Sequence, residues 1–263
     1  MGPYFQIAKL RLLTALTYRF EVVTGVASSL IMMAASVFLW KTVYRGIGSA
    51  AAVDQQQMVT YAIISVFLGA IFVTGVQGTI TRRIRRGEIA IDFIRPISLL
   101  GSWLAEDAGG VLSALAVRFL PLLVLAGLFF GLPLPASRTA LPVFLVSCLF
   151  SFGILWLLSA LSGMLAFWTI EIGHMGLVKD TLVWLMSGGV VPIWFFPEWF
   201  QALSRYLPFI YTYQTPLAIY IGRTPVREAA PALAVQFFWL ILLGVLVRYV
   251  WHCGHRRVMV QGG

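Results

Sequence analysis

The sequence has little charge for its length. Only 11% of its 263 residues are Asp, Glu, Lys or Arg, whereas 60% are hydrophobic and the mean hydropathy is +0.89. A soluble domain of this size has about 25% charged residues. This deficit excludes a soluble fold. Because apolar runs recur along the chain with only short polar breaks, we interpret residues 1–263 as a single membrane domain.

Residues that commonly support catalysis or bind metals are also scarce. The chain has two cysteines and three histidines, too few for a disulfide framework or for a cluster at one membrane depth. His252, Cys253 and His255 are packed too closely to match a zinc-ligand spacing. Glu171 and His174 lie three residues apart but have no nucleophile beside them. We therefore predict no catalytic residue, no metal and no cofactor on this chain, which disfavours an intramembrane enzyme.

Long apolar segments dominate the rest of the chain. A membrane-spanning helix needs about 20 mainly apolar residues, because the hydrocarbon layer is about 30 Å thick. Six segments meet this requirement, which predicts an all-α polytopic membrane protein. The predicted spans are residues 22–40, 59–78, 107–130, 141–167, 176–195 and 229–250.

The basic residues favour one orientation of these spans. If the N-terminus is cytoplasmic, the cytoplasmic segments have about twice as many Lys and Arg residues as the outer ones, which favours both termini inside. Residues 1–21 combine apolar side chains on a loosely helical period with basic ones, as in an interfacial helix. The formal charge of +9 therefore indicates topology and contact with membrane lipid, and not binding to nucleic acid.

Two polar connections are long enough to have a role beyond turning the chain. The cytoplasmic one includes residues 82–100, where a basic run and Gly87 precede the amphipathic stretch EIAIDFIR. The outer one, residues 194–228, is too apolar for an exposed loop and has too many prolines for one span. We expect this outer segment to form a hairpin of half-helices that dips into the membrane.

The order of these parts resembles a type-2 ABC export permease. The stretch RRGEIAIDFIRPISLL within residues 82–100, and residues 187–222 beginning SGGVVPIWFF, are similar to a bacterial subfamily of multidrug and antibiotic exporters. The genes of that subfamily generally lie beside those of a second permease and an ATPase. The chain has no GxxxxGK[ST] phosphate loop, so ATP and Mg²⁺ would be bound by another chain.

The resemblance implies a coupling helix between spans two and three, which docks in a cleft of the ATPase. On a helix, Ile91 and Arg95 would share one face, and Glu88 and Asp92 another. The residues assigned to this coupling are Arg85, Arg86, Gly87, Glu88, Ile91, Asp92, Arg95 and Pro96.

Arg118 and a Gly/Pro cluster are the other candidate functional residues. A charge near the middle of span three must face the bundle interior or a cavity. We interpret Arg118 as a structural pairing or as part of a substrate pathway, and its counterpart could come from another subunit. Gly188, Gly189, Pro192 and Pro197 are expected to kink the chain and to gate the outer end of the pathway.

These features predict the membrane subunit of an ATP-driven exporter in the bacterial inner membrane. Its partners would be an ATPase dimer and a second permease, identical or related, and its substrate would be amphipathic. The alternative is a stand-alone channel or secondary transporter, which needs no ATPase and often shows inverted repeats or ionisable pairs at the membrane midplane.

Overall fold

A computed structural model of the chain describes residues 5–10, 13, 19–47, 53–92, 98–169 and 175–261. The regular elements within these ranges are helices, which confirms the all-α prediction. The α-helices are α2 (Arg19–Ile47), α3 (Gln55–Ile71), α4 (Val76–Arg85), α5 (Ile89–Asp92), α6 (Leu99–Ala114), α7 (Leu120–Phe129), α8 (Ala140–Met164), α9 (Met175–Met186), α10 (Glu198–Arg205), α11 (Gln214–Tyr220) and α12 (Ala229–Gln261).

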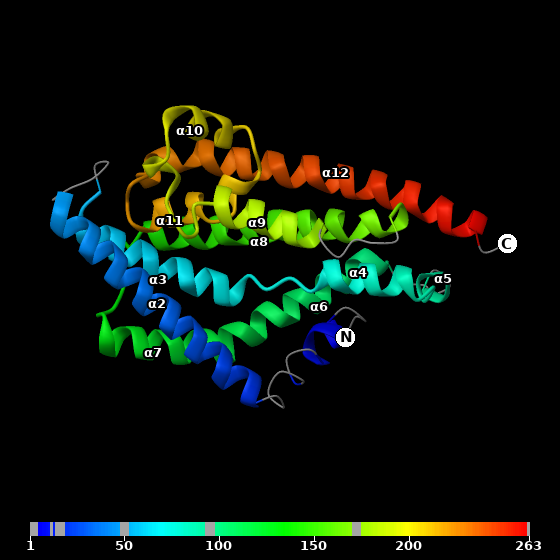
Figure 1. Cartoon of the computed structure of the whole chain (residues 1–263), viewed down its shortest axis with the longest axis horizontal. Coiled ribbons are helices and arrows are strands. Elements are labelled where there is room, and N and C mark those ends of the chain that lie inside the picture. The colour runs from blue at the N-terminus through cyan, green and yellow to red at the C-terminus, as the bar shows by residue number, and fades with distance from the viewer. Residues whose placement is uncertain are drawn as a thin grey trace.

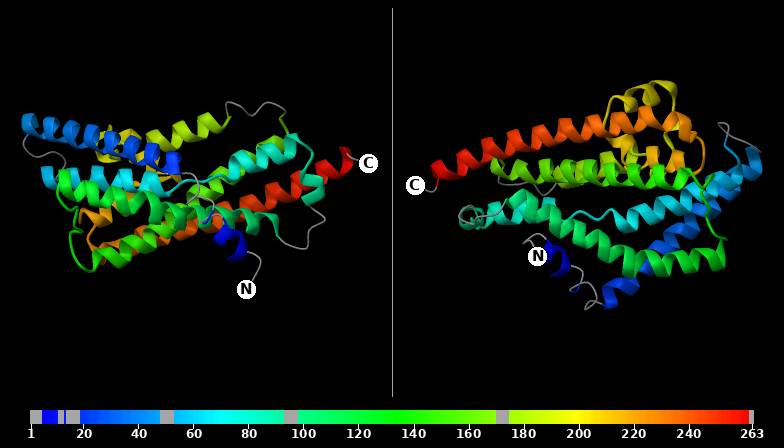
Figure 2. Two further views of the ribbon diagram at one scale, coloured as in Figure 1. Left: turned by 90° about the horizontal axis from the view of Figure 1, so that it is seen from below. Right: turned by 180° about the vertical axis from the view of Figure 1, so that it is seen from behind.

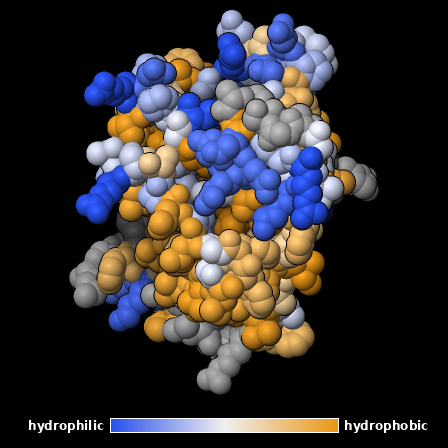
Figure 3. Space-filling model, turned by 90° about the vertical axis from the view of Figure 1, so that its left-hand side faces the viewer, coloured by the Kyte–Doolittle hydropathy of each residue, from blue (hydrophilic) through white to orange (hydrophobic). Residues whose placement is uncertain are grey.

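The long helices lie side by side along the longest axis of the molecule (Figures 1 and 2). Helix α5 and the C-terminal end of α12 lie at one end of the bundle, here called the α5 end. Helices α10 and α11 lie toward the opposite end, the α10 end. Figure 3 views the molecule from that side, where hydrophilic residues gather in the upper half and hydrophobic residues cover most of the lower half.

Five helices among the described residues are long and apolar enough to cross a membrane. They are Phe20–Gly46, Gln55–Arg85, Leu99–Phe129, Ala140–Phe167 and Val226–Gly254. They correspond to predicted spans one to four and six. The fifth predicted span, residues 176–195, is α-helical only over α9, whose 12 residues cover about 18 Å. Six crossings therefore stay a prediction.

Several helices are longer than the hydrocarbon layer requires. A break at residues 72–75, about 20 residues from the start of α3, marks the edge of that layer. The carboxylate of Asp107 on α6 accepts hydrogen bonds from the backbone N–H groups of Gly75 and Val76, at 2.9 and 3.1 Å. It thereby caps the start of α4. Beyond this level α4, the first part of α6 and the end of α12 extend toward the α5 end.

The N-terminal segment packs against α6 close to that boundary. Residues 5–10 are helical, and a Cβ on Gly109 would lie 2.5 Å from the backbone oxygen of Ala8. Gly109 lies about 20 residues before the end of α7, so this contact is near the edge of a 30 Å layer. The interfacial helix expected for residues 1–21 stays a prediction; of these residues the structure describes 5–10, 13 and 19–21.

Buried polar groups join helices that are distant in sequence. Gln236 on α12 is fully buried and accepts a hydrogen bond from Ser147 Oγ at 2.9 Å. Its amide nitrogen donates to the hydroxyl of Ser151 at 3.1 Å and to the backbone oxygen of Tyr211 at 2.8 Å. Hydrogen bonds between membrane helices contribute about 0.6 to 2 kcal/mol each. This cluster fixes α8, α12 and the loop before α11 as one rigid unit.

Candidate functional site

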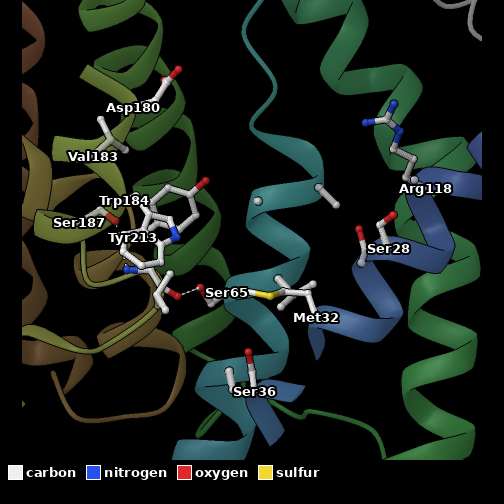
Figure 4. Close-up of a pocket in the computed structure, with 18 residues that line it drawn as sticks. Ser28, Met32, Ser36, Ser65, Arg118, Asp180, Val183, Trp184, Ser187 and Tyr213 are labelled. Carbon is white, nitrogen blue, oxygen red and sulfur yellow. Dashed lines mark hydrogen bonds between the residues drawn. The ribbon is translucent and has the colours of Figure 1, made fainter. Parts of the chain in front are cut away.

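A cavity of about 530 Å³ lies between α2, α3 and α9. Figure 4 shows residues of α2 on one wall, residues of α9 on the other and α3 between them. Its volume is in the range of small-molecule sites. The lining residues are Gly25, Ser28, Ser29, Met32, Ser36, Ala62, Ser65, Val66, Gly69, Ala70, Arg118, Asp180, Val183, Trp184, Ser187, Gly189, Val190 and Tyr213.

The lining holds many polar groups for a membrane interior, and we call this cavity the polar cavity. Five serines, Arg118 and Asp180 contribute to it, together with apolar side chains such as Met32 and Trp184. Hydroxyl groups and charges in a hydrocarbon layer are costly unless they face water, a polar ligand or one another. The composition therefore suits a molecule with both polar and apolar parts.

The cavity extends from the α5 side of the layer past its middle. Asp180 follows Lys179, whose ammonium donates to the hydroxyl of Ser159 at 3.1 Å. Ser159 lies about 20 residues into α8, at the boundary that Asp107 marks. At the other extreme Ala62 lies about seven residues, or about 10 Å, into α3, beyond the middle of the layer.

Arg118 reaches the cavity from an irregular turn. The segment Leu115–Phe119 between α6 and α7 is π-helical, and such turns often occur at functional sites. The guanidinium lies 3.3 Å from Glu21 at the start of α2, and it packs beside Gly25. The sequence showed no certain mid-membrane carboxylate, and we considered a counterpart on another subunit. The structure instead places Arg118 beside a carboxylate of the same chain.

A non-helical segment, residues 187–192, follows α9 and contributes Ser187, Gly189 and Val190 to the cavity wall. Helix α9 ends at Met186, and Gly188 has a positive φ of 77°. The helix therefore ends where the sequence predicted a kink. The Tyr61 hydroxyl donates to the backbone oxygen of Gly188 at 2.7 Å, and the Ser65 hydroxyl donates to that of Gly189. Side chains of α3 therefore satisfy carbonyl groups that would otherwise be unpaired in the membrane.

Gln214 at the start of α11 fixes the same segment from the other side. Its backbone N–H donates to the oxygen of Ser187 at 2.8 Å. Its side-chain oxygen accepts from the Tyr61 hydroxyl at 2.9 Å and from the N–H of Ile193 at 3.1 Å. The segment is held between α3 and α11 by hydrogen bonds from both.

The prolines and aromatic residues that follow carry the chain back over the bundle. Pro192 precedes the short 3₁₀ turn Ile193–Phe195, and Pro197 precedes α10. Trp194 lies beneath the guanidinium of Arg223, whose Cζ is 4.3 Å from the ring centre, a cation–π geometry. Partial burial lowers the pKa of Arg223, and the nearby phenols of Tyr44 and Tyr61 act in the opposite direction.

The predicted coupling region lies at the α5 end. Helix α4 ends at Arg85, Gly87 has a φ of 70°, and the short helix α5 follows. Arg83 forms an ion pair with Asp92, whose side chain is only 2% exposed. This pair joins α5 to α4, so the Asp92 carboxylate already has a partner within the chain.

Other coupling residues differ in their surroundings. Arg85 is exposed, and Arg86 lies 3.7 Å from Glu88, with both of their side chains largely exposed. Arg95 and Pro96 lie outside the described residues, as does the side chain of Ile91. The docking role assigned to this region stays a prediction, and Arg85, Arg86 and Glu88 are its accessible charges.

Most of the other residues weighed from the sequence lie outside the part of the chain that the structure describes. Glu171 and His174 lie outside the described residues, as does the His255 side chain. Within the part of the chain that the structure describes, no three His, Cys, Asp or Glu residues come together as metal ligands would. No signal in the sequence indicates the Glu21–Arg118 and Tyr61–Gln214 contacts, because the residues of each pair are more than 90 positions apart.

Comparison with known proteins identifies the family of the chain. The model of the family described as ABC-2 family transporter protein matches residues 30–262, which is most of the chain. No curated protein and no solved structure matches the chain significantly. From the extent of the family match and the membrane-crossing helices that it covers, we conclude that the chain belongs to the ABC-2 transporter family, as the membrane permease subunit of an ABC transporter.

Proposed function

We propose that this permease subunit exports an amphipathic small molecule or lipid-like substrate from the cytoplasm or the inner leaflet, driven by ATP hydrolysis on a partner ATPase. The observation that supports this most strongly is the position of the polar cavity. Its lining extends from Asp180, on the side of the α5 end, to residues 187–192, which Tyr61 holds in place. A substrate would enter beside Asp180 and stop at these residues.

The topology follows from placing the α5 end in the cytoplasm. The basic end of α4, with Arg82, Arg83 and Arg85 in its last turn, would then face the cytoplasm, as the distribution of positive charge favours. Both termini would be cytoplasmic in the bacterial inner membrane. Residues 187–192 would complete a sixth crossing, because irregular backbone is tolerated at membrane depth where protein surrounds it.

A second permease subunit would cover the open side of the cavity. Helix α2 is mostly exposed in the single chain, as are Leu177, Trp184 and Leu185 on α9. These two helices form opposite walls of the cavity (Figure 4). Two subunits, identical or related, that meet at these helices would enclose one shared pathway between them.

The ATPase would dock at the α5 end. The membrane component of this family is not catalytic, and membership implies association with an ABC ATPase. Arg85, Arg86 and Glu88 are the accessible charged groups there. The Arg83–Asp92 ion pair would transmit a displacement of α5 to α4 and, through the capped break at residues 72–75, to α3 along the cavity wall.

The experiment is purification of the tagged chain from its host membrane in mild detergent, with mass spectrometry of the retained proteins. We expect an ABC ATPase in the wild-type sample and at least a tenfold loss in Arg85→Glu with Arg86→Glu. Arg248→Glu on the exposed surface of α12 is the matched charge-reversal control and should retain the ATPase. Absence of any ATPase from the wild-type sample would instead support a stand-alone channel or secondary transporter.

A further inference from the structure

A second cavity, of about 400 Å³, lies on the opposite side of α3 and is almost wholly apolar. Its walls come from α3, the segment from α6 to α7, and α8; they include Phe67, Leu68, Phe119 and Cys148. The hydroxyl of Tyr220, the one lining tyrosine, donates to the backbone oxygen of Pro133 at 2.6 Å. We call this cavity the apolar groove.

Helix α3 separates the two cavities, and its sequence is patterned for this. Ala62, Ser65 and Gly69 face the polar cavity at spacings of three and four residues. Ile64, Phe67, Leu68 and Ile71 face the apolar groove on the same period. The π-helical turn does the same, because Arg118 lines the polar cavity while Leu115 and Phe119 line the groove. The groove is therefore a distinct site.

The groove runs inward from the α10 end. Along α8 it extends from Leu141, near that end, to Phe152. At 1.5 Å per residue this distance is about 16 Å, close to half of the roughly 30 Å hydrocarbon layer. On α3 the groove is lined by residues between Ile64 and Phe72, a depth that it shares with the polar cavity on the opposite face.

The rim of the groove is open to the surroundings of the bundle. Leu145 and Leu149 on α8 are 58% and 68% exposed, and Leu115 across the groove is 37% exposed. Water does not fill apolar cavities that offer it no polar partners. In a membrane, a hydrocarbon chain is the group that fits this lining and this depth.

A basic group lies at the end of the groove nearest the membrane surface. Arg138 is exposed, is three residues before Leu141, and is in the turn that precedes α8. Within the described ranges no carboxylate lies close enough to pair with it. The start of a 25-residue helix follows directly, and its positive dipole end adds to the attraction for an anion.

We propose that the apolar groove binds one acyl chain of a phospholipid from the leaflet at the α10 end, whose anionic headgroup lies against Arg138. The bound lipid would pack against the face of α3 opposite the polar cavity. The site does not depend on what the transporter exports, and a lipid bound here need not be a substrate.

Native mass spectrometry of the detergent-purified protein, titrated with phosphatidylglycerol or phosphatidylcholine, tests the proposal. We expect wild-type protein to retain one phosphatidylglycerol after extensive washing. Cys148→Trp fills the groove and should reduce retention of both lipids at least tenfold. Val245→Trp, on an exposed part of α12, is the matched control and should retain wild-type binding. Arg138→Gln should lower only the preference for phosphatidylglycerol over phosphatidylcholine.

Three outcomes would overturn the proposal. The first is a wild-type protein that keeps no lipid, a result independent of whether any variant folds. The second is equal lipid retention by Cys148→Trp and Val245→Trp, given matching elution profiles and helical content. The third is an unchanged headgroup preference in Arg138→Gln, which would remove the headgroup contact.

Discussion

Replacing Gly188 by alanine tests how residues 187–192 are held in place at the wall of the polar cavity. Gly188 has a left-handed backbone with a φ of 77°, which costs a non-glycine residue roughly 1–2 kcal/mol. A Cβ there would also lie 2.2 Å from the side-chain oxygen of Gln214, which must then move. That oxygen accepts from the Tyr61 hydroxyl and the Ile193 N–H. The hydroxyl keeps the backbone oxygen of Gly188 as an acceptor, so the Ile193 N–H is the buried donor left unpaired, at a cost of about 1–3 kcal/mol.

These costs add up to about 2–5 kcal/mol, a large share of the roughly 5–15 kcal/mol that stabilises a typical folded protein. Reversible unfolding in mixed micelles with increasing SDS measures the change. Gly189→Ala is the matched control: its φ is not positive, and its nearest neighbours would lie 3.2 Å from the new Cβ. We expect it to cost less than about 1 kcal/mol. Equal free energies of unfolding for the two variants would refute the role given to Gly188.

Three further predictions concern the charged groups. Asp107→Ala should reduce the free energy of unfolding by about 1–3 kcal/mol in the same assay, because two N–H groups at the start of α4 lose their cap. Glu106→Ala is the control and should not reduce it. Arg118→Gln should alter ATP-driven transport in vesicles at least tenfold yet leave stability within about 1 kcal/mol, since its ion-pair partner is largely exposed. Asp92→Asn should weaken ATPase retention in the purification assay as much as the reversal of Arg85 and Arg86, because it frees α5 from α4.

The spans were predictable where the apolar run and the helix have the same limits. The run over residues 141–167 corresponds to the helix Ala140–Phe167, because an uninterrupted apolar segment must satisfy its backbone internally. The run over residues 59–78 does not, because α3 ends at Ile71 and α4 begins at Val76. Helix α6 begins at Leu99, eight residues before the predicted start at 107, because the hydroxyl of Ser98 accepts a hydrogen bond from the N–H of Gly101 and caps it. Hydropathy counts these amphipathic residues as a loop.

The contacts that build the site were not predictable, because they join distant segments. The Gly/Pro cluster indicated a bend near residue 188, but hydropathy continues through Val190 and gives no sign that α9 ends at Met186. The end is stabilised by Tyr61 and Gln214, whose positions depend on the tertiary packing of α3 and α11. Arg118 was recognised from its charge alone, whereas its partner Glu21 lies at the edge of another span.

Sided labelling of the polar cavity tests the central claim most directly. Ser29→Cys on α2, with Cys148 and Cys253 replaced by alanine, places one thiol on the cavity wall. The reagent is a membrane-impermeant maleimide added from the cytoplasmic side of the purified transporter complex in vesicles. Val23→Cys, exposed on α2 but outside the cavity, is the control. We predict labelling of Ser29→Cys without nucleotide and protection with ATP and vanadate, while Val23→Cys reacts equally in both states. Labelling of Ser29→Cys that is the same with and without nucleotide, or that occurs only from the opposite side, would contradict an ATP-driven cavity open toward the α5 end.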